Sequence, residues 1–126
     1  MLSRRLKVAA AGATMVAAAA GSVVATSQPA NAVSCYRNGN GTTECYVWHT
    51  APSYYGGTGG RTGGYLYAGW NYFYCQGKGF EVNAFGYHNN WWLRTDDDNH
   101  HRNVWVNAVY VSSGGNDQPI PGVPRC

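Results

Sequence analysis

All four cysteines of the chain lie after an N-terminal segment with the features of an export signal: Cys35, Cys45, Cys75 and Cys126. An even number of cysteines in a small exported domain indicates disulfides, which offset a core of modest size. Spacing alone leaves three pairings open. We favour Cys35–Cys45 and Cys75–Cys126, because the first pair encloses two Asn-Gly turn signals and the second would fasten the Pro-rich tail to a strand. A zinc site is the alternative, but no two cysteines have its C-x₂₋₄-C spacing.

Residues 1–32 have the organisation of a secretory signal peptide. A basic start, Met1 to Lys7, is followed by the uncharged Ala/Val/Gly run from Val8 to Ala25 and by the small-residue site Ala30-Asn31-Ala32. These features predict cleavage after Ala32, with a retained membrane anchor as the alternative. Export would leave residues 33–126 as one domain in an oxidising, extracellular or envelope compartment.

The formal charge of residues 33–126 is near zero. Three of the nine basic residues belong to the leader, so that six basic residues remain, against six acidic ones. The six remaining basic residues are scattered singly along the chain. Partners rich in phosphate bind through many clustered Lys and Arg contacts. We therefore expect no nucleic acid partner, and no membrane anchor once the leader is cut.

Aromatic residues dominate this domain: five Trp, ten Tyr and three Phe, with few aliphatic residues. Since each large ring buries roughly 150 Å² or more, the composition predicts an aromatic core. Outside the leader no stretch has helical periodicity, and short aromatic or β-branched runs alternate with Gly-rich turns. The pattern predicts an all-β fold, a small barrel or sandwich of five or six short strands.

Individual segments are assigned from the same signals. We expect a hairpin over Val33–Val47 and a loop over Trp48–Gly64 with a mobile Gly-rich part. Tyr65–Tyr67 and Trp70–Cys75 are expected to form two short strands, or one strand bent at Ala68-Gly69. After the turn 77–79 we expect a separate strand over Phe80–Phe85. Loop residues follow from Ser112 to Asp117, and the tail Pro119–Pro124 is expected to be extended and polyproline-like.

The stretch from Asn90 to Val111 is the centre of the domain. Two runs that favour strands, Trp91–Thr95 and Val104–Val106, flank the polar segment Asp96–Asn103, which we expect to be an exposed loop. A tight turn is expected over Asn107–Val111, because the apolar positions stop alternating there.

Four segments resemble the bacterial SH3 (SH3b) family. Val47–Ser53 is similar to its opening strand and turn, Gly64–Gly69 to its G-x-L-x-x-G segment, Asn90–Arg94 to its G-W-x-x-V strand, and Val104–Val111 to its closing G-W-V-x-x-x-Y-L motif. The chain departs from the pattern at His49, where the family has arginine, and at Asn103-Val104, where it has glycine. The resemblance implies a small SH3-like barrel, with a short 3₁₀ turn before the last strand, that binds bacterial cell wall. The whole layout also resembles small secreted proteins of actinobacteria, which implies no particular activity.

The surplus of aromatic rings supplies the candidate binding residues. We expect Trp91, Trp105 and Tyr110 in the core, and four rings at the surface, where flat apolar faces suit sugars and extended peptides. These candidate ligand-binding residues are Tyr54, Tyr55, Tyr87 and Trp92.

Catalytic and metal chemistry have weaker support. Asp96–Asp98 with His100 and His101 could ligate a metal, but neither EF-hand order nor H-E-x-x-H spacing is met, and a hydrogen-bonded turn is the better interpretation. The serines, Ser53 among them, have no recognisable catalytic partner. We regard His49 and His88 as surface or packing residues.

Taken together, these features predict a secreted monomer that binds cell-wall peptidoglycan or a related envelope glycan or peptide, without catalysis, cofactor or metal. One alternative is an inhibitor or effector that binds an extracellular protein through the Gly-rich loop or the tail. Another is a minimal cell-wall hydrolase that uses the acids at 96–98.

Overall fold

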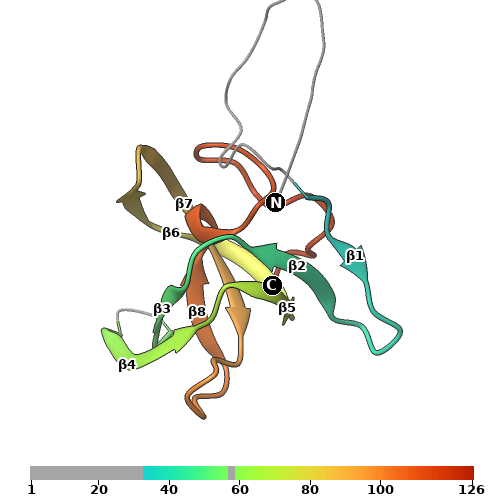
Figure 1. Cartoon of the computed structure of the whole chain (residues 1–126), viewed down its shortest axis with the longest axis horizontal. Coiled ribbons are helices and arrows are strands. Elements are labelled where there is room, and N and C mark those ends of the chain that lie inside the picture. Colours follow the sequence, from blue (N-terminus) through green and yellow to red (C-terminus); the bar gives the residue numbers. More distant parts are fainter. Residues whose placement is uncertain (1–32, 57–58) are drawn as a thin grey trace, which may run out of the picture.

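The computed structural model describes residues 33–56 and 59–126, which form an all-β domain (Figure 1). The predicted signal peptide lies outside the described residues, and so do residues 57 and 58 of the Gly-rich loop. The elements are β1 (Tyr36–Arg37), β2 (Thr43–Val47), β3 (Ala51–Tyr54), β4 (Arg61–Leu66), β5 (Gly69–Phe73), β6 (Cys75–Ala84), β7 (Tyr87–Thr95), β8 (Val104–Asn107) and the 3₁₀ turn η2 (Ala108–Tyr110). Within the described ranges the structure contains no helix long and apolar enough to cross a lipid bilayer.

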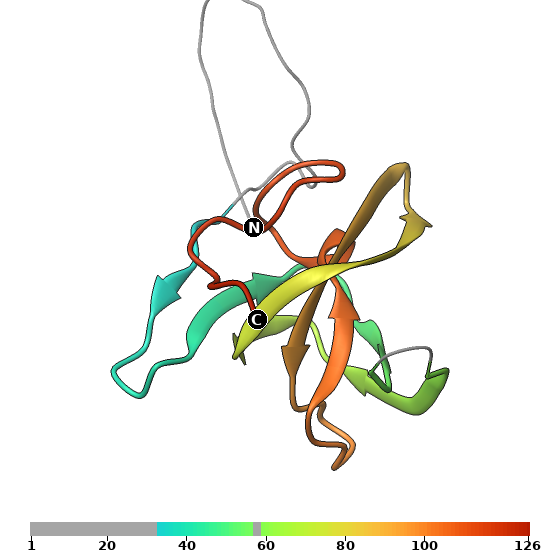
Figure 2. The same cartoon turned by 180° about the vertical axis from the view of Figure 1, so that it is seen from behind.

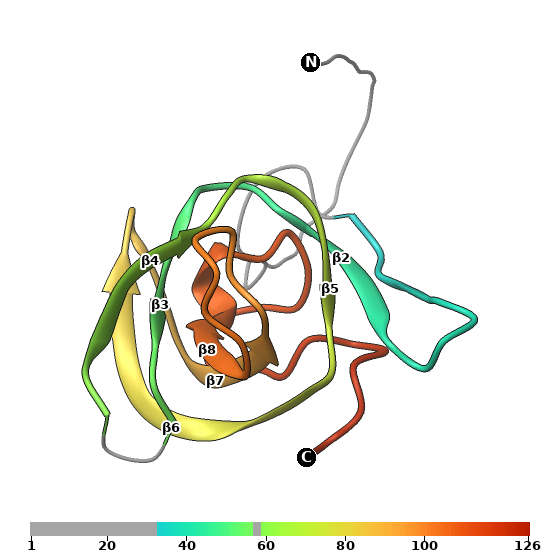
Figure 3. The ribbon, with the colours of Figure 1, turned by 90° about the horizontal axis from the view of Figure 1, so that it is seen from below.

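The strands form two antiparallel sheets, one of three strands in the order β1-β2-β5 and one of five in the order β4-β3-β8-β7-β6. The β1–β2 hairpin projects from the body of the domain (Figure 3). The chain passes directly from β5 into β6, so that one long segment contributes to both sheets. Among residues 33–56 and 59–126 the sheets do not close into a single barrel, and eight strands replace the five or six expected.

Two disulfides connect the chain as the sequence favoured. Cys35 bonds Cys45 across the β1–β2 hairpin, and Cys75, the first residue of β6, bonds Cys126. The described residues include all four cysteines, and none is free. Because disulfides persist where the surroundings are oxidising, the pairing indicates an oxidising, extracellular type of compartment.

The core is mainly aliphatic, which corrects the expectation of an aromatic one. The largest side chains with almost no exposure include Phe73, Leu66, Leu93 and Ile120, and valines from β2, β8 and the segment after it are buried as deeply. Trp91 is buried as expected, beneath the Arg125 guanidinium, which lies 4.5 Å from its ring centroid. Tyrosines carry a hydroxyl that must be satisfied, and most of them stay at least partly exposed.

Trp105 and Tyr110 are half-buried rather than fully buried, so that their assignment to the core was wrong in part. Tyr110 packs against the core cluster from its edge. The turn expected over Asn107–Val111 is confirmed as η2. Asn107 caps it, because its side-chain oxygen accepts a 2.8 Å hydrogen bond from the Val109 N–H.

Two segment assignments were wrong. The segment Trp48–Gly64 is not one loop, because β3 and β4 pair within it with a bulge between Pro52 and Tyr54. Phe80–Phe85 is not a separate strand, since β6 runs through the glycines at 77 and 79 with an irregular register between Lys78 and Val82. A strand can continue through glycines where it has a bulge. In the sequence, however, the same glycines are typical of a turn, so a turn was predicted.

The C-terminal tail is folded back rather than extended throughout, with a turn at Pro121-Gly122. Gln76 of β6 is buried and holds this tail: its amide donates to the carbonyls of Ile120 (2.8 Å) and Val123 (2.7 Å), and its oxygen accepts from the Ile120 N–H (2.8 Å). Figure 2 shows the tail ending beside the first part of β6, where Arg125 bridges to Gln76.

Candidate binding site

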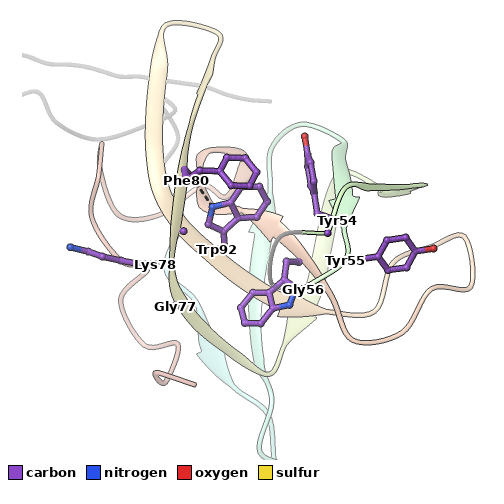
Figure 4. A pocket seen from close by; sticks show the side chains of 10 residues that line it. Tyr54, Tyr55, Gly56, Gly77, Lys78, Phe80 and Trp92 are labelled. Carbon is purple, nitrogen blue, oxygen red and sulfur yellow. Dashed lines mark hydrogen bonds between the residues drawn. The ribbon is translucent and has the colours of Figure 1, made fainter.

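A pocket of about 180 Å³, which we call the aromatic hollow, lies on the outer face of the five-stranded sheet (Figure 4). It is lined by Tyr54, Tyr55, Gly56, Gly59, Gly77, Lys78, Gly79, Phe80, Trp92 and Trp105. Strands β3, β6, β7 and β8 and the start of the Gly-rich loop thus all contribute, although they are distant along the chain.

Strand register brings the rings to one face. Tyr54 of β3 lies directly opposite Trp105 of β8, which lies opposite Arg94 of β7. Side chains two residues apart on a strand share a face, so Trp92 is on the side of Arg94 and therefore of Trp105. Trp91 and Leu93, which alternate with Trp92, point into the core.

Trp92 is held rigidly as the wall of the hollow. Its Nε1–H donates a 2.9 Å hydrogen bond to the Phe80 carbonyl oxygen, drawn as a dashed line in Figure 4. The Phe80 ring lies against it at a centroid distance of 4.7 Å, and Tyr54 meets it edge to face at 5.1 Å. These contacts leave Trp92 only 5% exposed, which corrects its placement among the surface rings. A preformed wall of this kind costs little ordering entropy on binding.

Two glycines are required where the backbone crosses the indoles. A Cβ at Gly79 would lie 2.7 Å from Trp92 Cδ1, and a Cβ at Gly56 would lie 2.9 Å from Trp105 Nε1. No side chain fits at either position unless the ring moves. The glycines therefore keep the backbone close to both rings and hold the hollow open between them.

The hollow is apolar with a small number of polar groups. Trp105 Nε1–H donates to no residue that the structure describes, unlike the indoles of Trp48 and Trp92. Lys78 is the one charged residue among the described lining residues, and in Figure 4 it and Tyr55 point away on opposite sides. The Arg61 guanidinium lies 6.0 Å from the Tyr54 ring. An uncharged floor with donors and cations at its edge suits a ring or aliphatic group that carries acceptors.

The structure brings together three of the four predicted binding residues, Tyr54, Tyr55 and Trp92. Tyr87 lies elsewhere, half-buried, with its ring 6.1 Å from that of Trp48. The sequence missed Phe80, because it was assigned to a separate strand, and Trp105, because its motif was taken as core. Alternation along β8 was the available signal for Trp105, since Val104 and Val106 on either side of it are fully buried.

The polar loop over 96–103 is a hydrogen-bonded turn, as favoured, but it is not wholly exposed, because Asp97 is buried. Asp96 accepts from the hydroxyls of Tyr72 and Tyr74 and from the Asn103 N–H. Burial alone would raise the pKa of Asp96, but these hydrogen bonds outweigh it and lower the pKa below its usual value.

Asp97 ties the loop to β3. Its Oδ2 accepts from Ser53 Oγ (2.6 Å) and His101 Nδ1 (2.8 Å), and its Oδ1 accepts from the backbone N–H groups of Asn99 and His101. Burial would raise the pKa of Asp97, and the hydrogen bonds from Ser53, His101 and Asn99 reverse this and lower it. Ser53 thus has a partner that the sequence did not reveal.

This trio lacks the order of a nucleophilic triad. In such a triad the serine donates to the histidine and the histidine to the carboxylate. Here Ser53 and His101 both donate to Asp97, so the histidine does not lie between the serine and the carboxylate as it does in a triad. The arrangement fixes the loop to β3.

Comparison of the chain with models of protein families, with curated proteins and with solved structures finds no match. Function must therefore be inferred from the site itself.

Proposed function

We propose that this protein is an exported, non-catalytic binding module whose aromatic hollow recognises cell-wall peptidoglycan or a related envelope glycan or peptide. The observation that carries the proposal is the hollow itself, in which Tyr54, Trp92, Trp105 and Phe80 surround an apolar floor. Aromatic rings with polar edges are the side chains best suited to sugar rings and extended peptides.

The size of the hollow favours one unit of a polymer over a small free ligand. Pockets that enclose drug-sized molecules have roughly 300–1,000 Å³, whereas this hollow has about 180 Å³. It can therefore hold a single ring or side chain while the rest of the ligand lies on the surrounding surface. Polymers of the cell envelope present such units repeatedly along their length.

The SH3b resemblance supports the same assignment. We propose that the two sheets are an open form of the small SH3-like barrel, joined where β5 continues into β6. The oxidised cysteines agree with a protein that works outside the cell. Export by the predicted leader over 1–32 would bring the hollow to the envelope.

Sedimentation with purified sacculi tests the proposal. The untagged protein should pellet with sacculi, and Tyr55→Ala should weaken binding by about tenfold, equal to about 1.4 kcal/mol. Tyr36→Ala is the matched control, since Tyr36 and Tyr55 are 54% and 52% exposed. Tyr36 lies on β1 of the three-stranded sheet, whereas the strands that line the hollow belong to the five-stranded sheet. Protein that stays in the supernatant at every sacculus concentration would contradict the proposal.

A protein partner is the second candidate, and one surface favours it. On the three-stranded sheet Trp70 contacts Tyr36 and Tyr46, each at a centroid distance of 5.5 Å, and Trp70 and Tyr36 are exposed. If Tyr36→Ala loses binding while Tyr55→Ala keeps it, this face and not the hollow is the contact surface. The alternative of a tail-mediated contact is less favoured, because Gln76 and Cys75 hold the tail down.

A further inference from the structure

We propose that Glu81, His88 and Asp117 form a binding site for a divalent transition-metal ion of the zinc type. Each side chain offers one ligand atom, and these atoms all lie within 4.8 Å of one another. Nothing in the sequence pattern indicated the site, because the three residues come from β6, β7 and the loop before the tail.

The central ligand is the Nδ1 atom of His88. It lies 2.9 Å from Glu81 Oε2 and 3.0 Å from Asp117 Oδ2. A neutral imidazole has one proton, which Nδ1 can direct at one carboxylate only, yet both carboxylates face it. A cation at the position of that proton would be shared by all three groups.

Two carboxylates also meet each other here. The ligand oxygens of Glu81 and Asp117 lie within 4.8 Å of each other. Like charges this close need a shared proton or a cation between them. In addition, Asp117 Oδ1 is buried and accepts no hydrogen bond from any described residue.

The backbone around the site is fixed before any ion binds. The His88 N–H donates to Asn116 Oδ1 (3.0 Å), and the Asp117 N–H donates to the His88 carbonyl oxygen (3.2 Å). The amide of Asn89 donates to the carbonyl of Gly115 (3.0 Å), which fastens the same loop to β7. The side chains themselves are 39–42% exposed, so that an ion can enter and water can complete its coordination.

The ligand set selects among cations. One imidazole nitrogen with two carboxylate oxygens suits Zn²⁺, whose ligands lie about 2.0–2.2 Å from the ion in tetrahedral geometry with water as the fourth. Such ligands are about 3.4 Å apart, so the observed separations of 2.9 and 3.0 Å need to widen by only a few tenths of an ångström. Ca²⁺ prefers six to eight oxygen ligands and should bind poorly.

Calorimetry with ZnCl₂ on the untagged protein tests the proposal, with thermal unfolding as the second readout. We expect one Zn²⁺ per chain, a melting temperature that rises with Zn²⁺ concentration, and a much weaker response to CaCl₂. His88→Ala, Glu81→Gln and Asp117→Asn should each weaken Zn²⁺ binding by more than the roughly 10- to 100-fold that loss of an outer-shell partner costs. Asp117→Asn suits the positive φ of 59° at this residue, and Glu81→Gln keeps the side-chain shape.

His100→Asn is the control, because His100 is exposed in the 96–103 loop, outside the trio, and its φ of 73° tolerates asparagine. This variant should bind Zn²⁺ as the unmodified protein does. Melting curves without metal show whether each variant folds. Absence of Zn²⁺ binding in the unmodified protein, or binding that survives His88→Ala in a folded variant, would overturn the proposal.

Discussion

Tyr54 of β3 and Trp92 of β7 meet edge to face, with centroids 5.1 Å apart and planes at 83°, although β8 lies between their strands. The rings reach diagonally over β8, and Trp105 of that intervening strand lines the same hollow. Edge-to-face pairs contribute roughly 0.5–1.5 kcal/mol beyond the area they bury. The contact thus stabilises the sheet and shapes the surface that we propose as the binding site.

Replacement of Gly79 tests whether the backbone must lie against Trp92. Gly79→Ala would place a Cβ 2.7 Å from Trp92 Cδ1, so we expect a loss of roughly 1–3 kcal/mol in the free energy of unfolding. Gly77→Ala is the control on the same strand, since a Cβ there meets nothing within 4 Å. Chemical denaturation measures both, and equal stability of the two variants would contradict the close packing.

Replacement of Phe80 tests the hollow by function. Phe80 and Phe85 are 57% and 59% exposed, but only Phe80 lines the hollow, whereas Phe85 lies against His49 and Trp48. We expect Phe80→Ala to weaken sacculus binding about tenfold and Phe85→Ala to leave it unchanged. Sedimentation of both variants measures this, and a larger loss with Phe85→Ala would move the contact surface to the β6–β7 turn.

Replacement of Asp97 tests the carboxylate that holds the polar loop. Asp97→Asn removes the charge that accepts from Ser53 and His101, and we expect a loss of roughly 2–3 kcal/mol at pH 7. Folding lowers the pKa of Asp97, so its contribution is present above the usual value of 3.8 and fades as the pH falls through the folded-state value. The difference between the two proteins should therefore shrink in acid.

Denaturation at pH 7 and at successively lower pH measures the Asp97 effect, with Asp98→Asn as the control, since Asp98 is exposed. A difference between Asp97→Asn and the unmodified protein that stays constant down to strong acid would show that the charge is not the cause.

Replacement of Gln76 tests how the tail is held. Gln76→Ala leaves the Ile120 N–H and the Val123 carbonyl without their partner and removes one of two donors to the Ile120 carbonyl, for an expected loss of roughly 2–4 kcal/mol. Amide exchange of Ile120 should also become faster, while that of the Val109 N–H, which bonds Asn107, should not change. An unchanged exchange rate at Ile120 would mean that the Cys75–Cys126 disulfide and the backbone hydrogen bonds of residue 76 with Pro124 and Cys126 fix the tail without this side chain.

Local patterns allowed much of the fold to be predicted. Asn-Gly pairs correctly predicted the first hairpin and the disulfide that it encloses. The glycine-containing first parts of β4 and β6 were missed, because they carry little strand propensity of their own and form through pairing with β3 and β7.

The candidate site was predicted only in part, for a physical reason. Tyr54, Tyr55 and Trp92 could be named because aromatic rings were in surplus, but their grouping depends on the order β3-β8-β7-β6, which is set by non-local pairing. The same holds for Glu81, His88 and Asp117, whose spacing along the chain matches no metal motif.

The indole N–H signals in an NMR titration test the central claim most directly. Trp48 and Trp92 donate their Nε1–H groups to the carbonyls of Val109 and Phe80, whereas the Nε1–H of Trp105, which lines the hollow, has no partner among the described residues. On addition of soluble peptidoglycan fragments, we expect the Trp105 signal to move most and the Trp48 signal to stay in place. Fragments that bind while the Trp105 signal remains unmoved would contradict the assignment of the aromatic hollow as the binding site.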